Sequence, residues 1–288
     1  MAKPDDLCVS DKVIKNTSYN AIGRIWFGVI GVFLTPYIIG RIGVDRFAIW
    51  ALVSVLTNYF ALLDFGVGSS FVKYISEFYT QKDYPRINKL LNTGFGFYFV
   101  FALVIIAGTL IFLDPLLSFM KVSALYYSEA KFVFLLGISV FCVSNAIGTF
   151  ISIPSGLQRM DIPNTIAIAV SCLNMAGTIF FLERGMGLRG LMINNALTFA
   201  VSSMLSIVAA YKLLPQLKFM PFAWDPGMFK RIFSFGFRVQ VSRISGTIIG
   251  QTDKLLIAYF LAIGFVTYYQ LGNGVVNYVM AVPALLIS

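Results

Sequence analysis

Eight apolar runs divide this sequence, and they restrict its fold more than any other feature. A helix needs about 20 apolar residues to cross the hydrocarbon core of a bilayer, and each run is close to that length or longer. The runs are uniformly apolar rather than alternating, so they do not resemble barrel strands. The sequence therefore predicts an all-α integral membrane protein with about eight transmembrane helices. We expect these spans at residues 20–39, 47–63, 90–113, 132–157, 162–182, 190–211, 233–260 and 266–288.

Composition agrees with this class and argues against several kinds of chemistry. Of the 288 residues, 58% are hydrophobic and 12% are charged, whereas a soluble chain needs far more polar surface. The sequence contains no histidine, which removes the commonest general base and any Ser-His-Asp triad. Its three cysteines are widely separated and have neither disulfide nor metal-ligand spacing. We therefore expect a chain that is not an enzyme, with no catalytic residue, no cofactor and no metal.

The positive charges predict both a partner and an orientation. The net charge of +9 is spread along the chain rather than held in one basic block, which favours an anionic partner over a nucleic acid. With the N-terminus inside, the inner segments hold twice as many Lys and Arg residues as the outer loops, as expected of a cytoplasmic N-terminus. The inner set is Lys3, Lys12, Lys15, Lys73, Lys82, Arg86, Lys89, Arg159, Lys212, Lys218, Lys230 and Arg231. The outer set is Arg41, Arg46, Lys121, Lys131, Arg184 and Arg189.

The spans fall into two groups around a proline-rich segment of mixed polarity. We expect a cytoplasmic tail at residues 1–19, a six-helix bundle at 20–211, a cytoplasmic linker at 212–232 and the first two helices of a second bundle at 233–288. Because six spans precede the linker and only two follow it, we expect this chain to be the N-terminal portion of a longer polypeptide of twelve or more spans.

The first and seventh spans resemble each other. Each carries an arginine early in the helix, Arg24 and Arg243, and an Ile-Gly pair follows each span, at Gly43 and at Gly264. A parallel repeat of six helices is a known transporter design, with the substrate site between the halves. This weak repeat predicts corresponding roles for the two arginines.

Arg24, Arg238 and Arg243 all fall in the cytoplasmic half of their predicted helices. A charge at the bilayer centre costs at least ~2.5–3.5 kcal/mol, so such groups usually face protein or a water-filled cavity. A long arginine side chain also has the alternative of lifting its head to the interface, which we favour for Arg238. For Arg24 and Arg243 we favour a cavity, where guanidinium groups bind phosphate through two parallel hydrogen bonds.

Two further charges, Asp253 and Lys254, lie nearer the outer end of the seventh span. Adjacent helical residues point about 100° apart, so these two do not pair face to face. In one interpretation Lys254 reaches outward to the interface while Asp253 finds a partner such as Thr252. In the other, Asp253 is a proton or cation site that couples ion movement to transport.

Two segments resemble a known family. The run from Arg41 to Glu77 contains Gly43, Asp45, Phe47, Trp50 and the Leu63-Asp64-Phe65-Gly66 turn, and it looks like the first outer turn and second helix of bacterial polysaccharide exporters. The run from Gly250 to Gly272 resembles their seventh helix and the turn that follows it. The chain is thus similar to the lipid-linked oligosaccharide (O-antigen type) flippases of the multidrug/oligosaccharidyl-lipid/polysaccharide exporter superfamily.

The resemblance implies a multi-pass protein of the bacterial inner membrane with two helical bundles. It implies that an undecaprenyl-pyrophosphate-linked oligosaccharide is flipped by alternating access for O-antigen or other surface polysaccharide assembly. The implied partners are this glycolipid, membrane lipids, H+ or Na+ as coupling ion, and the polysaccharide polymerase machinery. In this setting Arg24, Arg243 and Arg238 are candidates for binding the pyrophosphate.

Two other function classes compete with this interpretation. A cation-coupled multidrug antiporter of the same superfamily needs acidic groups in its cavity, whereas arginine outnumbers aspartate inside these spans. A membrane-embedded glycosyltransferase or polymerase needs a large outer loop or a loop rich in carboxylates. The outer loops predicted here are short and carry few acids.

Overall fold

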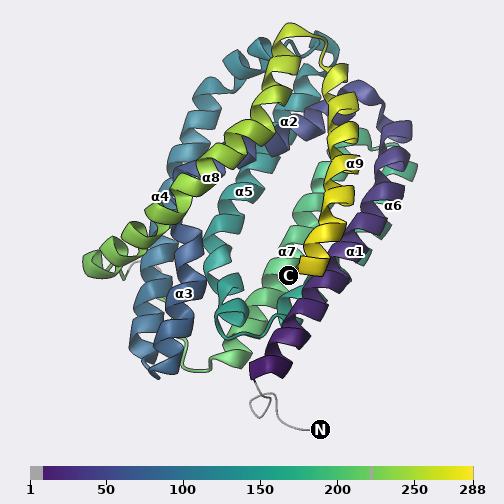
Figure 1. The fold of residues 1–288 in the computed structure, drawn as a ribbon. Coiled ribbons are helices and arrows are strands. Elements are labelled where there is room, and N and C mark those ends of the chain that lie inside the picture. Colours follow the sequence, from purple (N-terminus) through teal and green to yellow (C-terminus); the bar gives the residue numbers. More distant parts are fainter. Residues whose placement is uncertain (1–8, 221–222, 288) are drawn as a thin grey trace.

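Nine α-helices and two short 3-10 helices form the described part of the chain in a computed structural model (Figure 1). The structure describes the backbone at residues 9–220 and 223–287, and side chains at 23, 25–220, 223–241, 244, 246–274 and 276. The elements are α1 (Val9–Ile42), α2 (Val44–Phe60), η2 (Ala61–Asp64), α3 (Val67–Thr80), α4 (Tyr84–Phe119), η3 (Ala124–Tyr126), α5 (Tyr127–Gly156), α6 (Asp161–Glu183), α7 (Gly187–Leu213), α8 (Pro226–Phe260) and α9 (Gly264–Ile287).

The predicted fold class is confirmed, because each long apolar run forms a long helix. Six helical segments of the described residues have both the length and the hydropathy of a membrane span, and they belong to α1, α2 with η2, α4, α5 with η3, α6 and α7. The expected seventh span forms α8, which has 35 residues and is about 52 Å long at 1.5 Å per residue. Its intramembrane charges lower its hydropathy, so α8 is not among these six.

The chain breaks between α2 and α3, at the Leu63-Asp64-Phe65-Gly66 turn. Phe65 and Gly66 both adopt left-handed backbone conformations, with φ of 52° and 72°, and this ends the helix. The Asp64 carboxylate accepts a hydrogen bond from the Gly66 backbone N–H at 2.5 Å and another from the Tyr98 hydroxyl at 3.3 Å. Asp64 is buried and fixes the turn from inside.

Aspartate caps start helices α4 and α8. Asp83 accepts from the Arg86 N–H at the start of α4, and Asp225 accepts from the Met228 N–H at the start of α8. That backbone hydrogen bond, with help from nearby Lys89, lowers the pKa of Asp225 below its usual value. Helix α8 thus begins inside the range 212–232 that we expected for the linker.

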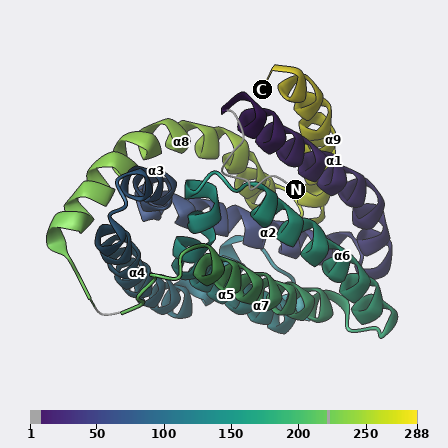
Figure 2. The same ribbon diagram turned by 90° about the horizontal axis from the view of Figure 1, so that it is seen from below.

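Helices α8 and α9 pack against the first seven helices through specific backbone contacts. The Ser70 hydroxyl of α3 donates to the Ile232 carbonyl oxygen of α8 at 2.8 Å. The Thr267 hydroxyl of α9 donates to the Val44 carbonyl oxygen of α2, also at 2.8 Å. Seen from below, α8 curves around α3 while α9 lies beside α1 (Figure 2). The two helices therefore meet at one end and lie against different parts of the bundle.

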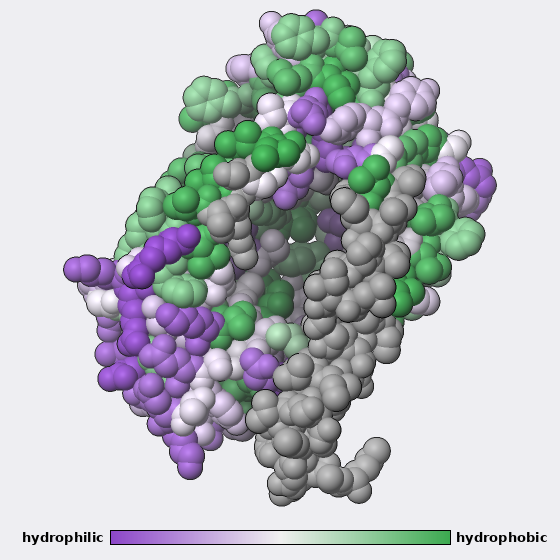
Figure 3. Space-filling view, in the orientation of Figure 1, coloured by the Kyte–Doolittle hydropathy of each residue, from purple (hydrophilic) through white to green (hydrophobic). Residues whose placement is uncertain are grey.

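A central hollow lies between α5 and α8 on one side and α1 and α9 on the other. The space-filling view shows this face of the molecule hollowed near its middle (Figure 3). In the view from below, α2 runs across the far end of the hollow (Figure 2). The start of α1 and the connections α3–α4 and α5–α6 all lie at the lower end in Figure 1. We refer to that end as the N-terminal end and to the other as the far end.

Candidate functional site

The two arginines expected in the cavity belong to two of the helices that border the central hollow. Arg24 belongs to α1 and Arg243 to α8, and the side chains of both lie outside the described residues. Next to Arg24, a Cβ added at Gly23 would lie 3.1 Å from the Asn164 side-chain oxygen of α6. The backbone at this point of α1 therefore packs closely on α6.

The third arginine, Arg238, is held by its own helix. Its Nε donates to the Ser234 carbonyl oxygen at 3.1 Å, and one terminal nitrogen donates to the Ser234 hydroxyl at 3.2 Å. The side chain is exposed and directed back by one turn, toward the N-terminal end of α8. This is the geometry expected of an arginine that lifts its head toward the nearer interface.

The contacts at the far end of α8 differ from the first interpretation of the sequence, in which Lys254 reaches outward and Asp253 pairs with Thr252. The Tyr269 hydroxyl of α9 donates to the Asp253 carboxylate at 2.5 Å, so the acid joins the two last helices. Lys254 is only 6% exposed and donates to the Gln251 side-chain oxygen at 3.1 Å, so it does not reach outward. Thr252, which we named as a partner for Asp253, instead pairs with the Tyr59 hydroxyl of α2 at 2.8 Å.

The turn after α2 is also bonded to α8. The Gln240 side-chain nitrogen donates to the Leu62 carbonyl oxygen at 3.0 Å, and this oxygen belongs to the short η2 helix. Nearer the N-terminal end, Arg231 and Glu77 form an ion pair at 2.6 Å between α8 and α3. One side of the hollow is thus a continuous interface between α8 and the first bundle.

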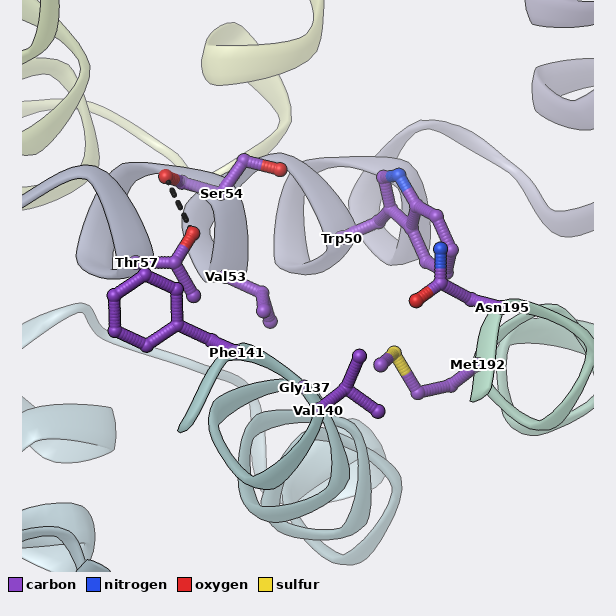
Figure 4. A pocket seen from close by; sticks show the side chains of 9 residues that line it. All are labelled: Trp50, Val53, Ser54, Thr57, Gly137, Val140, Phe141, Met192 and Asn195. Atoms are coloured by element: carbon purple, nitrogen blue, oxygen red, sulfur yellow. Dashed lines mark hydrogen bonds between the residues drawn. The ribbon is translucent and has the colours of Figure 1, made fainter. Parts of the chain in front are cut away.

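A pocket of about 190 Å³ lies where α2 crosses α5 and α7 (Figure 4). Its lining includes Trp50, Ser54 and Thr57 of α2, Phe141 of α5, and Asn195 of α7. The close-up shows the Trp50 ring and the Asn195 amide facing each other at one end of the pocket, with Phe141 and Thr57 at the other. No charged residue lines it.

Several polar groups of this pocket have no partner among the described residues. Thr57 donates its hydroxyl hydrogen to the Ser54 carbonyl oxygen at 3.0 Å, but the Ser54 hydroxyl, the Trp50 Nε1–H and the Asn195 amide make no hydrogen bond there. Sequence analysis missed this site. The signal that would have found it is the spacing of Trp50, Ser54 and Thr57, which places polar groups on one face of an otherwise apolar span.

The described residues contain no group of three or more Cys, Asp or Glu side chains placed to hold a metal ion.

Comparison with known proteins places the chain in a wider context. A family model described as polysaccharide biosynthesis protein matches residues 13–288. A curated relative from Shigella flexneri, named "Putative O-antigen transporter", is 22% identical over 278 residues. The aligned region covers 94% of this chain and 64% of that relative, so the chain spans somewhat less than two thirds of the relative's length.

Solved structures share the fold. An inward-facing multidrug resistance transporter of the MATE family, from the MOP superfamily, matches with a TM-score of 0.67 and 17% identity. The match covers 88% of this chain and 56% of the transporter. A second solved chain, named protein A, matches with a TM-score of 0.72 and 15% identity, over 95% of this chain and 62% of its own length.

Proposed function

The chain belongs to the polysaccharide biosynthesis protein family, and on this premise we propose that it moves a lipid-linked oligosaccharide across the membrane. The observation that carries the proposal is the family match over residues 13–288, in a multi-pass helical protein with a hollow between its helices. The name of the Shigella flexneri relative points to the same substrate class. We infer that the substrate is an undecaprenyl-pyrophosphate-linked glycan used for O-antigen or another surface polysaccharide.

The pyrophosphate is the part of this substrate that an arginine pair would recognise. Arg24 and Arg243 lie on α1 and α8, the two helices on opposite sides of the hollow. Guanidinium groups bind phosphate oxygens through two parallel hydrogen bonds, and they stay charged at any physiological pH. We assign first contact with the pyrophosphate to these two residues. Arg238 is bonded to Ser234, and we give it the lesser role of attracting anions to the entrance.

Charge also sets a direction for transport. Lys and Arg residues gather at the N-terminal end, including Lys73, Lys82, Arg86 and Arg231. The rule that positive loops stay inside supports a cytoplasmic N-terminus in the inner membrane. A diphosphate with about two negative charges then gains ~4–5 kcal/mol on moving outward across a potential of about 100 mV, at ~2.3 kcal/mol per charge.

Alternating access fits the arrangement of the last two helices. α8 and α9 meet at the far end and contact different parts of the first bundle, so a change in their angle would open one end of the hollow and close the other. The structural relative was captured in an inward-facing conformation, which supports such a cycle for this fold. Asp253, bonded to Tyr269 across the α8–α9 contact, is the group we assign to coupling with H+ or Na+.

A deletion of the complete gene in its source bacterium tests the proposal. Cells without it should accumulate the lipid-linked glycan on the cytoplasmic side and lose the surface polysaccharide. Restoring the gene should reverse both effects, and restoring it with Arg24→Ala and Arg243→Ala should not. Normal surface polysaccharide in the deleted strain, or a change only in resistance to cationic drugs, would refute the proposed substrate. The second result would favour the multidrug antiporter.

A further inference from the structure

We propose that the pocket between α2, α5 and α7 binds one neutral sugar ring of the transported glycan. This inference rests on the proposed function, because it identifies where the glycan portion of the lipid-linked substrate is held. It assigns a ligand to Trp50 and Ser54 of α2 and to Asn195 of α7. None of these residues belongs to the arginine site.

The size of the pocket fits one ring and not a chain of them. Its volume of about 190 Å³ corresponds to roughly six water molecules at ~30 Å³ each. Pockets for drug-sized ligands begin at about 300 Å³. A single pyranose, with six ring atoms and its hydroxyl groups, is therefore the largest part of an oligosaccharide that enters completely. The remaining sugars would stay in the hollow.

The chemistry of the lining matches a sugar. A pyranose has a flat patch of C–H bonds on one face and hydroxyl groups around its edge, each of which can donate and accept. The Trp50 indole offers a flat aromatic surface with an N–H donor at its rim. The Asn195 amide supplies both a donor and an acceptor, and the Ser54 hydroxyl supplies either. None of the three bonds to another described side chain or backbone group, so a ligand that displaces water from them breaks no hydrogen bond within the described part of the protein.

The same lining argues against the other parts of the substrate. Because no charged residue lines the pocket, it offers a pyrophosphate no counter-charge. An alkyl chain would leave the indole N–H, the amide and the hydroxyl unsatisfied, at a cost of about 1–3 kcal/mol for each buried group. Because the pocket offers no counter-charge, a neutral hexose should bind better than a hexuronic acid of the same shape.

The position of the pocket agrees with this division of the substrate. Helix α1 ends at Ile42, at the far end, and Arg24 lies 18 residues before it. At 1.5 Å per residue, Arg24 is therefore about 27 Å from the far end. Met192 and Asn195 lie only 5 and 8 residues from the start of α7 at Gly187, or about 8–12 Å from the same end. A glycolipid held by its pyrophosphate near Arg24 would therefore direct its distal sugars toward this pocket.

Saturation-transfer NMR on the purified chain in nanodiscs tests the proposal directly. The probes are the methyl pyranosides of glucose, galactose, mannose and N-acetylglucosamine, with methyl glucuronide as the charged comparison and octanol as the alkyl comparison. We expect saturation transfer to at least one neutral glycoside. Losing one neutral hydrogen bond should weaken its binding about fivefold in Trp50→Phe, which keeps an aromatic ring in place. Asn195→Leu should weaken binding by tenfold or more, because it removes both a donor and an acceptor.

Controls separate this inference from the proposed function. Trp224→Phe makes the same exchange in the linker before α8 and should bind the glycosides normally. Arg24→Ala and Arg243→Ala should also bind them normally, since these probes carry no phosphate, while losing glycolipid transport. The inference is overturned if no neutral glycoside shows saturation transfer, if the Trp50 and Asn195 variants bind as well as the original chain, or if octanol displaces the sugar. If glycolipid transport continues unchanged in those two variants, the pocket assignment fails and the proposed function survives.

Discussion

The backbones of Gly66 and Gly236 are in direct contact where α8 crosses the break between α2 and α3. A Cβ added at Gly66 would lie 2.1 Å from the Gly236 carbonyl oxygen, and one added at Gly236 would lie 2.6 Å from the Gly66 carbonyl carbon. Neither helix can retreat freely, because Gln240 bonds to Leu62 and Ser70 bonds to Ile232 on either side of the crossing. Because neither glycine has a side chain, the backbone of α8 can pack directly against the turn between α2 and α3.

Gly236→Ala should therefore destabilise the protein. Inserting a methyl group into this contact should cost about 1–3 kcal/mol, as overpacking does elsewhere. Thermal unfolding of the detergent-solubilised chain measures the effect. Gly250→Ala is the matched control on the same helix, because a Cβ there meets nothing within 4 Å. It should be neutral or stabilise α8 by up to about 1 kcal/mol. Equal effects of the two substitutions would contradict the proposed contact.

Asn194→Ala should weaken the packing of α6 on α7. Its amide donates to the Asn174 carbonyl oxygen at 2.9 Å and to the Thr178 hydroxyl at 3.1 Å, both on α6. Interhelical hydrogen bonds in membranes contribute about 0.6 kcal/mol on average and up to about 1.7 kcal/mol. We expect a loss in this range, measured by unfolding in mixed micelles. Asn195→Ala on the next residue should cost less, because that side chain makes no hydrogen bond in the described structure.

The cap of α8 predicts a dependence of stability on pH. The folded pKa of Asp225 is lowered because its carboxylate accepts the Met228 N–H and lies near Lys89. The stabilisation is therefore present above the unfolded pKa, about 3.9, and is lost as the pH falls through the folded value. Asp225→Ala should cost about 1 kcal/mol at pH 7 and much less near pH 2. Asp225→Asn keeps an acceptor but loses the charge, so it should retain part of the stabilisation at pH 7 and lose the dependence on pH. A cost of Asp225→Ala that stays constant with pH would rule out the ionised cap.

The three arginines should contribute unequally to glycolipid transport. Arg238 is bonded to Ser234 on its own helix, so Arg238→Gln should reduce the rate about fivefold or less, as for the loss of about 1 kcal/mol. Arg24→Ala and Arg243→Ala should each reduce it by tenfold or more, since a charge-assisted bidentate contact contributes ~1.5–3 kcal/mol. The initial transport rates of the three variants decide the order. A larger loss in Arg238→Gln than in the other two would contradict our assignment.

The contact between Asp253 and Tyr269 predicts a loss of ion coupling. Asp253→Asn removes the negative charge but keeps a group that accepts the tyrosine hydroxyl, so folding should be preserved. Its transport rate should no longer respond to an imposed proton or sodium gradient. Tyr269→Phe keeps the carboxylate and should retain part of the response. If Asp253→Asn responds to the gradients as the original chain does, another group carries the coupling.

Most of the fold was predictable because membrane spans are long and their signal is compositional. Most expected spans coincide with one long helix, although the span at 47–63 continues from α2 into η2, and the boundaries differ mainly where a cap fixes them, as at Asp225. The separate helix α3 was not expected. Its start depends on left-handed backbone at Phe65 and Gly66 and on the buried Asp64 that holds the turn, and the sequence gives only a bend signal for these residues.

The site was less predictable, because it depends on which helices meet. Sequence alone identified charged residues inside apolar spans, but it did not show that Asp253 would bond to Tyr269 or that Lys254 would be buried. The pocket was missed for the same reason. Trp50 and Asn195 belong to two spans that are far apart in the sequence. They line one pocket only because α2 crosses α7 in the folded protein.

The most direct test of the account is a transport assay in proteoliposomes. Vesicles would contain an undecaprenyl-pyrophosphate-linked oligosaccharide in both leaflets and the chain expressed from its complete gene. External periodate, which does not cross the membrane, oxidises only the sugars exposed outside. We expect the protein to make glycan from the inner leaflet accessible with time, and we expect Arg24→Ala combined with Arg243→Ala to abolish this gain. Vesicles with the protein that expose no more glycan than empty vesicles would contradict it.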